Sequence, residues 1–120
     1  MATIPATRVR TAADGRTCII WKWGPFGAGD TCTPVVCAQH KDKTVHLAKG
    51  SGFGGTVTIK GSVNPASDAT LLGLHNTDLS AMTATADFIG TVQEHVYQIA
   101  PSPGASVAGV TCYLILGDSK

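Results

Sequence analysis

A chain of 120 residues is long enough for one domain with a modest core. Charged residues make up 14% of it and hydrophobic residues 43%, at a net charge of +1, so the composition excludes a disordered chain and gives no reason to expect nucleic acid as the partner. No stretch approaches the ~20 apolar residues that a membrane span needs, and residues 1–15 lack the apolar core of a secretory signal. We therefore expect a protein that folds in a cytoplasm, with its four cysteines reduced.

Residues 1–16 differ from the rest of the chain. They contain Pro5 and show no apolar face. Their charged residues are one aspartate and three arginines: Asp14, Arg8, Arg10 and Arg16. We predict an extended N-terminal arm over residues 1–16, which either frays in solution or becomes ordered on a neighbouring molecule, and a folded domain over residues 17–120.

The remainder of the chain has the pattern of short strands. No window shows the apolar spacing of a capped helix; instead, glycines and prolines separate runs in which apolar and polar residues alternate. The runs cover residues 17–23, 33–39, 43–49, 55–62, 69–74, 83–92, 95–101 and 108–116. This pattern predicts an all-β domain of seven or eight short strands, a β-sandwich or jelly roll, with an imperfect barrel as the alternative.

The first of these runs, "TCIIWKW", places Ile19, Trp21 and Trp23 on one face of a strand. Tryptophans at alternate positions more often pack in a core or a subunit interface. On an open face they stack on sugar rings instead, so carbohydrate binding stays open as an alternative at this point.

The stretch "KGSGFGGTVTIKG", Lys49–Gly61, matches the spacing of a phosphate-binding glycine loop. A dinucleotide loop must open a helix, whereas "TVTIKGS" alternates like a strand. A kinase glycine loop does join two strands, but the chain has no H-R-D loop and is too short for two kinase lobes. We predict a hairpin connection here, with glycines that allow positive φ.

The last run, "AGVTCYLIL", is apolar on both faces. One face carries Val110, Cys112, Leu114 and Leu116, and the other carries Thr111, Tyr113 and Ile115. A strand of this kind is central in its sheet or lies under a partner.

The sequence gives only weak signals for a metal or catalytic site. Cys32, Cys37 and His40 are close in sequence, but "TPVV" between the cysteines is not the tight spacing of structural zinc, and an odd offset puts the two thiols on opposite faces of a strand. Buried free thiols are the expectation. No known catalytic motif joins the four histidines and eight acids, so we expect no enzyme, no catalytic residue, no cofactor and no metal.

Three segments together carry a resemblance to a known group of proteins. They are "GFGGTVTIKGS" (Gly52–Ser62), "YQIAP" (Tyr97–Pro101) and the run Val110–Leu116, with Leu72 and Leu74 between the first two. In this order the chain resembles short bacteriophage virion proteins encoded near major capsid genes, over about three fifths of its length. "SVNPASDATLL" departs from the usual S-N-D-G turn and following Trp, and "YQIAP" lacks the Arg of Y-I-R-P.

The resemblance implies a capsid decoration (cement) protein with a jelly-roll-like β-sandwich. Such a protein binds the major capsid protein on the virion exterior, as a dimer or trimer that bridges capsomers, after synthesis in the host bacterial cytoplasm. Neither nucleic acid nor membrane is a direct partner. The residues we expect to contact the shell are Arg8, Arg10, Arg16, Trp21 and Trp23. A phage tail or head–tail adaptor protein and a carbohydrate-binding module are the alternatives.

Overall fold

The computed structural model describes residues 2–11, 18–40 and 42–117, and every regular element in these ranges is a β-strand. In chain order the strands are β1 (Thr3–Ile4), β2 (Thr7–Thr11), β3 (Cys18–Phe26), β4 (Thr31–Cys32), β5 (Val35–Val36), β6 (Asp42–Ala48), β7 (Val57–Ser62), β8 (Leu72–Gly73), β9 (Thr83–Ala84), β10 (Phe88–Thr91), β11 (Gln98–Pro103) and β12 (Val110–Gly117). The all-β prediction is therefore confirmed. In these ranges no helix is long and apolar enough to cross a membrane.

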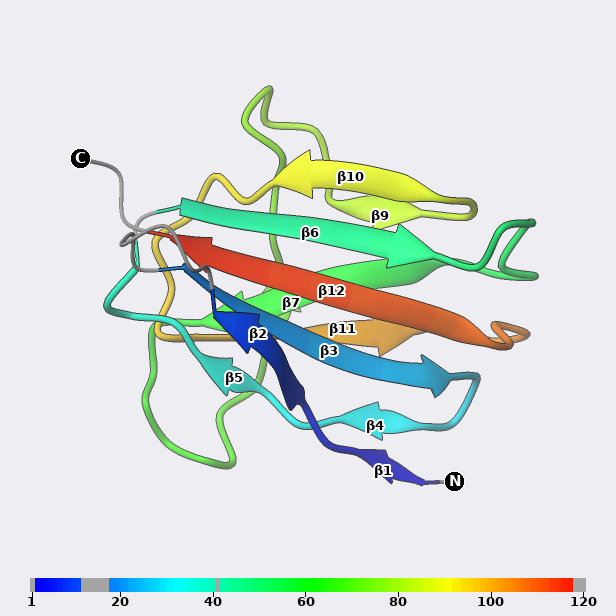
Figure 1. Ribbon diagram of the computed structural model, residues 1–120, viewed down its shortest axis with the longest axis horizontal. Coiled ribbons are helices and arrows are strands. Elements are labelled where there is room, and N and C mark those ends of the chain that lie inside the picture. The colour runs from blue at the N-terminus through cyan, green and yellow to red at the C-terminus, as the bar shows by residue number, and fades with distance from the viewer. Residues whose placement is uncertain (1, 12–17, 41, 118–120) are drawn as a thin grey trace.

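The strands form two layers and a small bridging sheet (Figure 1). The front sheet has the order β10-β6-β12-β3-β2, and the back sheet has the order β5-β11-β7-β8, with β9 also paired to β7. All neighbours within these two sheets are antiparallel. The short strands β1 and β4 pair in parallel beside them. Figure 1 shows the front sheet facing the viewer, with β7 and β11 behind it.

The core lies between the two layers. The strand β12 is central in the front sheet, between β6 and β3, as its two-sided apolar pattern predicts. Its inward residues Val110, Cys112, Leu114 and Leu116 are at most 1% exposed, and the opposing back sheet contributes Val57, Ile59 and Ile99 at similar burial. Each large aliphatic side chain buried in this way stabilises the fold by about 1.5–3 kcal/mol, which is more than an exposed ion pair contributes.

The glycine-rich stretch after β6 connects the two layers, so the hairpin predicted there is wrong. β6 ends at Ala48 in the front sheet, whereas β7 begins at Val57 in the back sheet. Between them, Phe53 is completely buried, its N–H donates to the carbonyl of Thr85 at 2.8 Å, and its carbonyl accepts from the N–H of Ala108 at 3.1 Å. Phe53 thus anchors the crossing segment in the core.

Close backbone approach explains the glycines that follow Phe53. A Cβ at Gly55 would lie 2.2 Å from the carbonyl oxygen of Ala105, and one at Gly54 would lie 2.6 Å from that of Ser106. Gly54 also has a φ of +83°, which residues with a side chain rarely adopt. The glycines are therefore required by the packing of the β11–β12 connection against this stretch.

The N-terminal segment is part of the sheets, which differs from the predicted extended arm. β2 pairs with β3 in the front sheet, and β1 pairs with β4. The β-branched residues Thr7 and Val9 favour this strand, which forms one edge of the front sheet. The predicted boundary at residue 16 lies outside the described residues, so the division of the chain into two parts stays a prediction.

The strands are also more numerous than the seven or eight predicted, because β1, β2 and β4 lie outside the predicted runs and one run divides into two strands. The run 33–39 gives only β5, preceded by β4, with Pro34 between them; proline has no N–H to donate to a ladder. The run 83–92 serves both layers, since β9 pairs with β7 in the back sheet and β10 pairs with β6 in the front sheet.

Part of the outer face of the back sheet is covered by a loop. The segment that follows β7 lies over the back sheet, where the side-chain amide of Gln98 donates to the carbonyls of Asn64 at 2.8 Å and Ala66 at 3.0 Å. Gln98 itself is only 6% exposed. Exposed apolar side chains occur on both sheets: Ile89 (67%) and Ile115 (41%) on the front sheet, and Val36 (56%) and Leu72 (68%) on the back sheet. On the front sheet, Ile89 and Ile115 lie together on one outer surface.

Candidate functional site

The two tryptophans of β3 have different surroundings, although both point toward the inner side of the front sheet. Trp23 is 1% exposed, and its indole N–H donates to the carbonyl of Thr33 at 2.7 Å. Trp21 is only half-buried and packs against the edge of the core. The two rings do not form the exposed pair that sugar stacking requires, and a contact through Trp23 would need it to leave the core.

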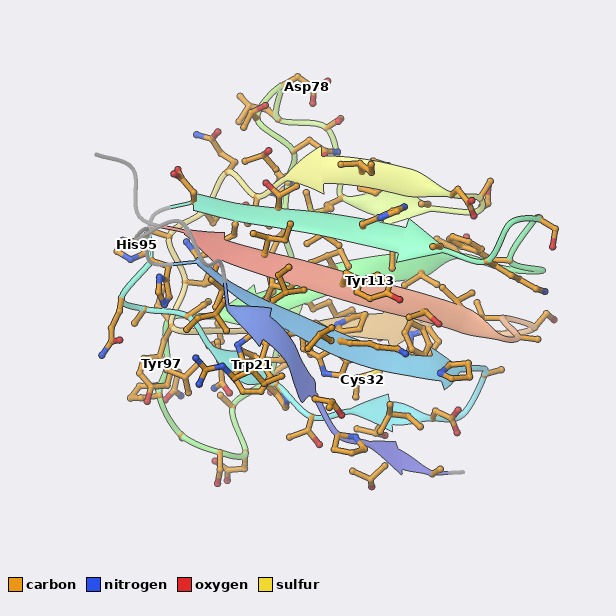
Figure 2. The ribbon with its side chains drawn as sticks, viewed as in Figure 1. Trp21, Cys32, Asp78, His95, Tyr97 and Tyr113 are labelled. Carbon is orange, nitrogen blue, oxygen red and sulfur yellow. The ribbon has the colours of Figure 1, made fainter. Side chains whose placement is uncertain are left out.

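Trp21 lines a groove of about 360 Å³ at the open side of the two layers, which we call the Trp21 groove. Its lining residues are Pro5, Ala6, Trp21, Thr33, Pro34, Val35 and Val36. The groove adjoins β2 and β5, which are the edge strands of the front and back sheets. Figure 2 shows Trp21 next to β2, with β5 close by. An indole ring in such a place presents both an apolar face and an N–H to a partner.

Arg8 adds a cation beside this groove. It lies opposite Trp21 in the β2–β3 pairing, so both side chains are on the same side of the sheet. The hydrogen-bond ladder between β2 and β3 shifts register between Arg8 and Arg10. A bulge of this kind makes an exposed edge strand less able to pair with a strand of another molecule. The structure thus brings Arg8 and Trp21 together. It places Arg10 in β2 by its backbone, and Arg16 lies outside the described residues.

A second surface lies on the outer side of the front sheet, which we call the isoleucine face. Its shallow groove of about 330 Å³ is lined by Ile20, Thr44, His46, Ile89, Tyr113 and Ile115. The rings of His46 and Tyr113 are 6.2 Å apart between centroids and tilted by 39°. Figure 2 shows Tyr113 on the viewer's side of β12. A contiguous apolar patch of this kind on a small domain is typical of a protein–protein contact.

Sequence reasoning found only part of the isoleucine face. The two-sided apolar pattern of the last run pointed to Tyr113 and Ile115. Ile20 and Ile89 could not be added, because they come from runs far away in the sequence and only the strand order β10-β6-β12-β3 aligns them with β12.

The described cysteines are free and buried, in agreement with the expected thiols: Cys32, Cys37 and Cys112. Burial raises the pKa of Cys32 to about 12 and that of Cys37 to about 11. Burial also raises the pKa of Cys112, and the nearby Cys32 adds to the effect. These groups are protonated at neutral pH and are poor nucleophiles. Within residues 2–11, 18–40 and 42–117, no group of three or more His, Cys, Asp or Glu side chains is placed to hold a metal ion.

Asp87 and Asp30, both in loops, accept hydrogen bonds from backbone amides. Asp87 accepts from the N–H groups of Lys49 at 2.9 Å and Gly50 at 3.1 Å, and these bonds lower the pKa of its carboxyl. Asp30 has a lowered pKa for the same reason, since it accepts from the N–H groups of Gly27 and Ala2. A carboxylate engaged in this way is not set up as a general base.

Glu94 pairs with His75 and not with its sequence neighbour His95. One carboxylate oxygen lies 2.6 Å from Nδ1 of His75, and the other accepts from the His75 backbone N–H at 2.9 Å. Burial raises the pKa of Glu94, but the bonds from His75 outweigh it and hold the pKa below its ordinary value. His95 instead has Nε2 at 3.0 Å from the carbonyl oxygen of Ala38. This contact ties two loops together and leaves no Glu94–His95 dyad.

Comparison with known proteins gives no match: no protein-family model, no curated protein and no solved structure is significantly similar to the chain.

Proposed function

We propose that the chain is a non-enzymatic structural protein of a bacteriophage virion, and specifically a capsid decoration (cement) protein with a jelly-roll-like β-sandwich. It binds the major capsid protein on the outer shell and bridges neighbouring capsomers. The sequence resemblance motivates the assignment, and the two apolar surfaces of the domain are compatible with it.

The segments that carry the resemblance occupy the centre of the fold. Gly52–Ser62 contains the end of the crossing between the layers and all of β7. Tyr97–Pro101 contains most of β11, which is the antiparallel neighbour of β7. Val110–Leu116 forms most of β12 in the opposite layer. A family defined by these segments would share a core and vary its surface, which is what a set of shell-binding proteins on different capsids requires.

The observation that carries the proposal is the Trp21 groove with Arg8 at its side. The groove presents a half-buried indole ring and apolar side chains between two sheet edges, and Arg8 adds a positive charge on the same side of β2 and β3. Tryptophan and arginine are the residue types that dominate binding energy in protein interfaces. A partner segment with an apolar side chain next to an acidic one matches this arrangement.

Stabilisation of a shell by such a protein needs no chemistry. A protein that binds assembled capsomers and not free ones shifts the assembly equilibrium by mass action, by about 2.7 kcal/mol per site at a concentration one hundred times Kd. A bridge across two capsomers opposes their separation under internal pressure. This mechanism is consistent with protonated thiols and carboxylates that are engaged with backbone amides.

The test is binding of the purified chain to undecorated capsids, measured by co-sedimentation. We expect saturable binding in numbers that match the symmetry of the shell. Trp21→Ala and Arg8→Ala should each weaken binding by roughly tenfold, as expected for interface anchors. Leu79→Ala and Lys49→Ala are the matched apolar and cationic controls, on exposed positions outside the groove, and should bind normally.

Point variants are preferable to deletion of residues 1–16, because deletion would remove β1 and β2 and expose the edge of β3. Absence of any saturable binding to capsids would refute the cement function. Binding confined to isolated tails or connectors would instead support the tail or head–tail adaptor alternative. Equal affinity of the Trp21 variant and its control would remove the groove from the contact.

A further inference from the structure

The isoleucine face carries two opposite charges placed symmetrically about its centre. Lys22 lies on β3, level with Tyr113 in the pairing, and Asp42 lies on β6, level with Gly117. Because β3 and β6 flank β12, Ile115 is midway between the two charges. The alternation of buried and exposed residues in β6 places Asp42 on the same side as His46, which lines the face.

The line from Lys22 to Asp42 is crossed at Ile115 by a second line, which runs from Ile89 to Ile115. Ile89 on β10 is level with His46 and Tyr113, and it lies two strands away from Ile115. On a flat sheet with a rise of about 3.4 Å per residue and about 4.8 Å between strands, the register makes the Ile89–Ile115 line perpendicular to the Lys22–Asp42 line. A two-fold axis along the Ile89–Ile115 line therefore exchanges the position of Lys22 with that of Asp42.

We propose that the isoleucine face binds the same face of a second copy of this chain about this axis. Ile115 then packs on Ile115 and Ile89 on Ile89, while each Lys22 meets the partner's Asp42. A contact of this kind is self-complementary, as the interface of a symmetric dimer must be. The two β12 strands cross at roughly 70° on the same strand geometry, which is close to the orthogonal class of sheet packing.

The size of the face sets the expected strength of the dimer. Five strands and the seven residues of β6 give a face of roughly 24 Å by 24 Å, or about 600 Å² in projection. Stable specific interfaces bury about 800 Å² of accessible surface per partner. A face of this size is typical of a reversible dimer and smaller than the interface of an obligate one. This inference does not rest on the capsid proposal, because the second copy is the only partner it requires.

Sedimentation equilibrium of the full chain over a range from about 1 μM to 1 mM tests the proposal. We expect a monomer–dimer equilibrium that Ile115→Glu shifts to monomer. The control Leu72→Glu changes an exposed aliphatic residue elsewhere, 68% exposed on the back sheet, and should leave the equilibrium unchanged. A wild-type chain that is monomeric at every concentration would overturn the proposal, and so would a dimer that Leu72→Glu disrupts and Ile115→Glu does not.

Charge exchange tests the axis itself. Lys22→Glu and Asp42→Lys should each weaken the dimer about tenfold, because each puts like charges together at two symmetric places. The double variant Lys22→Glu/Asp42→Lys restores opposite charges and should recover the wild-type dissociation constant. Two weakened single variants without recovery in the double variant would refute the pairing of Lys22 with the partner's Asp42.

The charge variants also guard against a folding failure of Ile115→Glu, because they change only charged side chains on the outer face, a half-buried lysine and an exposed aspartate; circular dichroism of each variant checks the fold. If the wild-type chain stays monomeric and Ile115→Glu abolishes capsid binding, the shell and not a second copy covers the face, and the proposal is wrong. Loss of capsid binding through Trp21→Ala, with an unchanged dimer, would separate the two surfaces and support both proposals.

Discussion

The indole N–H of Trp23 donates to the carbonyl of Thr33 at 2.7 Å and so ties β3 of the front sheet to the segment between β4 and β5. Trp23 is otherwise enclosed in the core, whereas Trp21, two residues earlier on the same face, lies at a groove. The same residue type on the same face therefore serves the interior at one position and a surface at the other.

This difference predicts unequal stability effects. Trp23→Phe removes the bond to Thr33 and leaves space in the core, so the free energy of unfolding should fall by about 2–3 kcal/mol. Trp21→Phe, the matched control, should lower it by less than about 1 kcal/mol, because the site is half open to solvent. Urea unfolding followed by circular dichroism measures both. Equal losses in the two variants would contradict the structure.

The glycines between the layers should differ sharply in tolerance. Gly55→Ala puts a Cβ 2.2 Å from the carbonyl oxygen of Ala105, so we expect a loss of more than about 2 kcal/mol in the free energy of unfolding. Gly52→Ala meets only the carbonyl oxygen of Thr85 at 3.9 Å, so it should be nearly neutral. Thermal unfolding of both variants decides; a tolerated alanine at Gly55 would mean that the loops do not approach as described.

The Glu94–His75 contact should make stability depend on pH. The pKa of Glu94 in the folded state is below its ordinary value. The contact therefore adds to the free energy of unfolding above the ordinary carboxyl pKa of about 4.3, and this stabilisation is lost as the pH falls through the folded-state pKa. Glu94→Gln should lower the free energy of unfolding at pH 7 by up to about 1 kcal/mol, since the pair is partly exposed. At a pH below both values the variant and the wild type should be equally stable. Asp68→Asn is the control, and a loss in Glu94→Gln that persists unchanged in acid would refute the linkage.

Thiol labelling should distinguish native from unfolded protein. In a Cys18→Ser variant, the three remaining cysteines are buried and their pKa values are raised, to about 12 for Cys32 and about 11 for Cys37. We expect labelling by a maleimide at pH 7 to be slow in buffer and complete in urea. Mass spectrometry of the peptides identifies each site. Rapid labelling of any of the three in buffer would contradict its burial.

Part of the fold could be predicted because it is local. Alternation with a period of two identified the strands that became β3, β6, β7, β11 and β12, and the two-sided apolar run at 108–116 indicated the central strand. The run 83–92 shows the limit of this reasoning. Nothing in its sequence says that Thr83–Ala84 pairs in the back sheet and Phe88–Thr91 in the front sheet, because pairing depends on residues far away in the chain.

The candidate site divides in the same way. Arg8 and Trp21 were predicted as partner contacts, and the structure places them opposite each other on the adjacent strands β2 and β3. The sequence did not show that Trp23 is buried, because Trp21 and Trp23 occupy equivalent positions in the alternating pattern. By itself, the sequence determined the all-β class, the buried thiols and the apolar character of β12, since these follow from composition and local periodicity. Only the tertiary structure decided that the glycine-rich stretch crosses between layers, and that Lys22, Asp42, Ile89 and Ile115 share one face. Strand order and register are long-range properties, and they place side chains from distant runs within reach of one another.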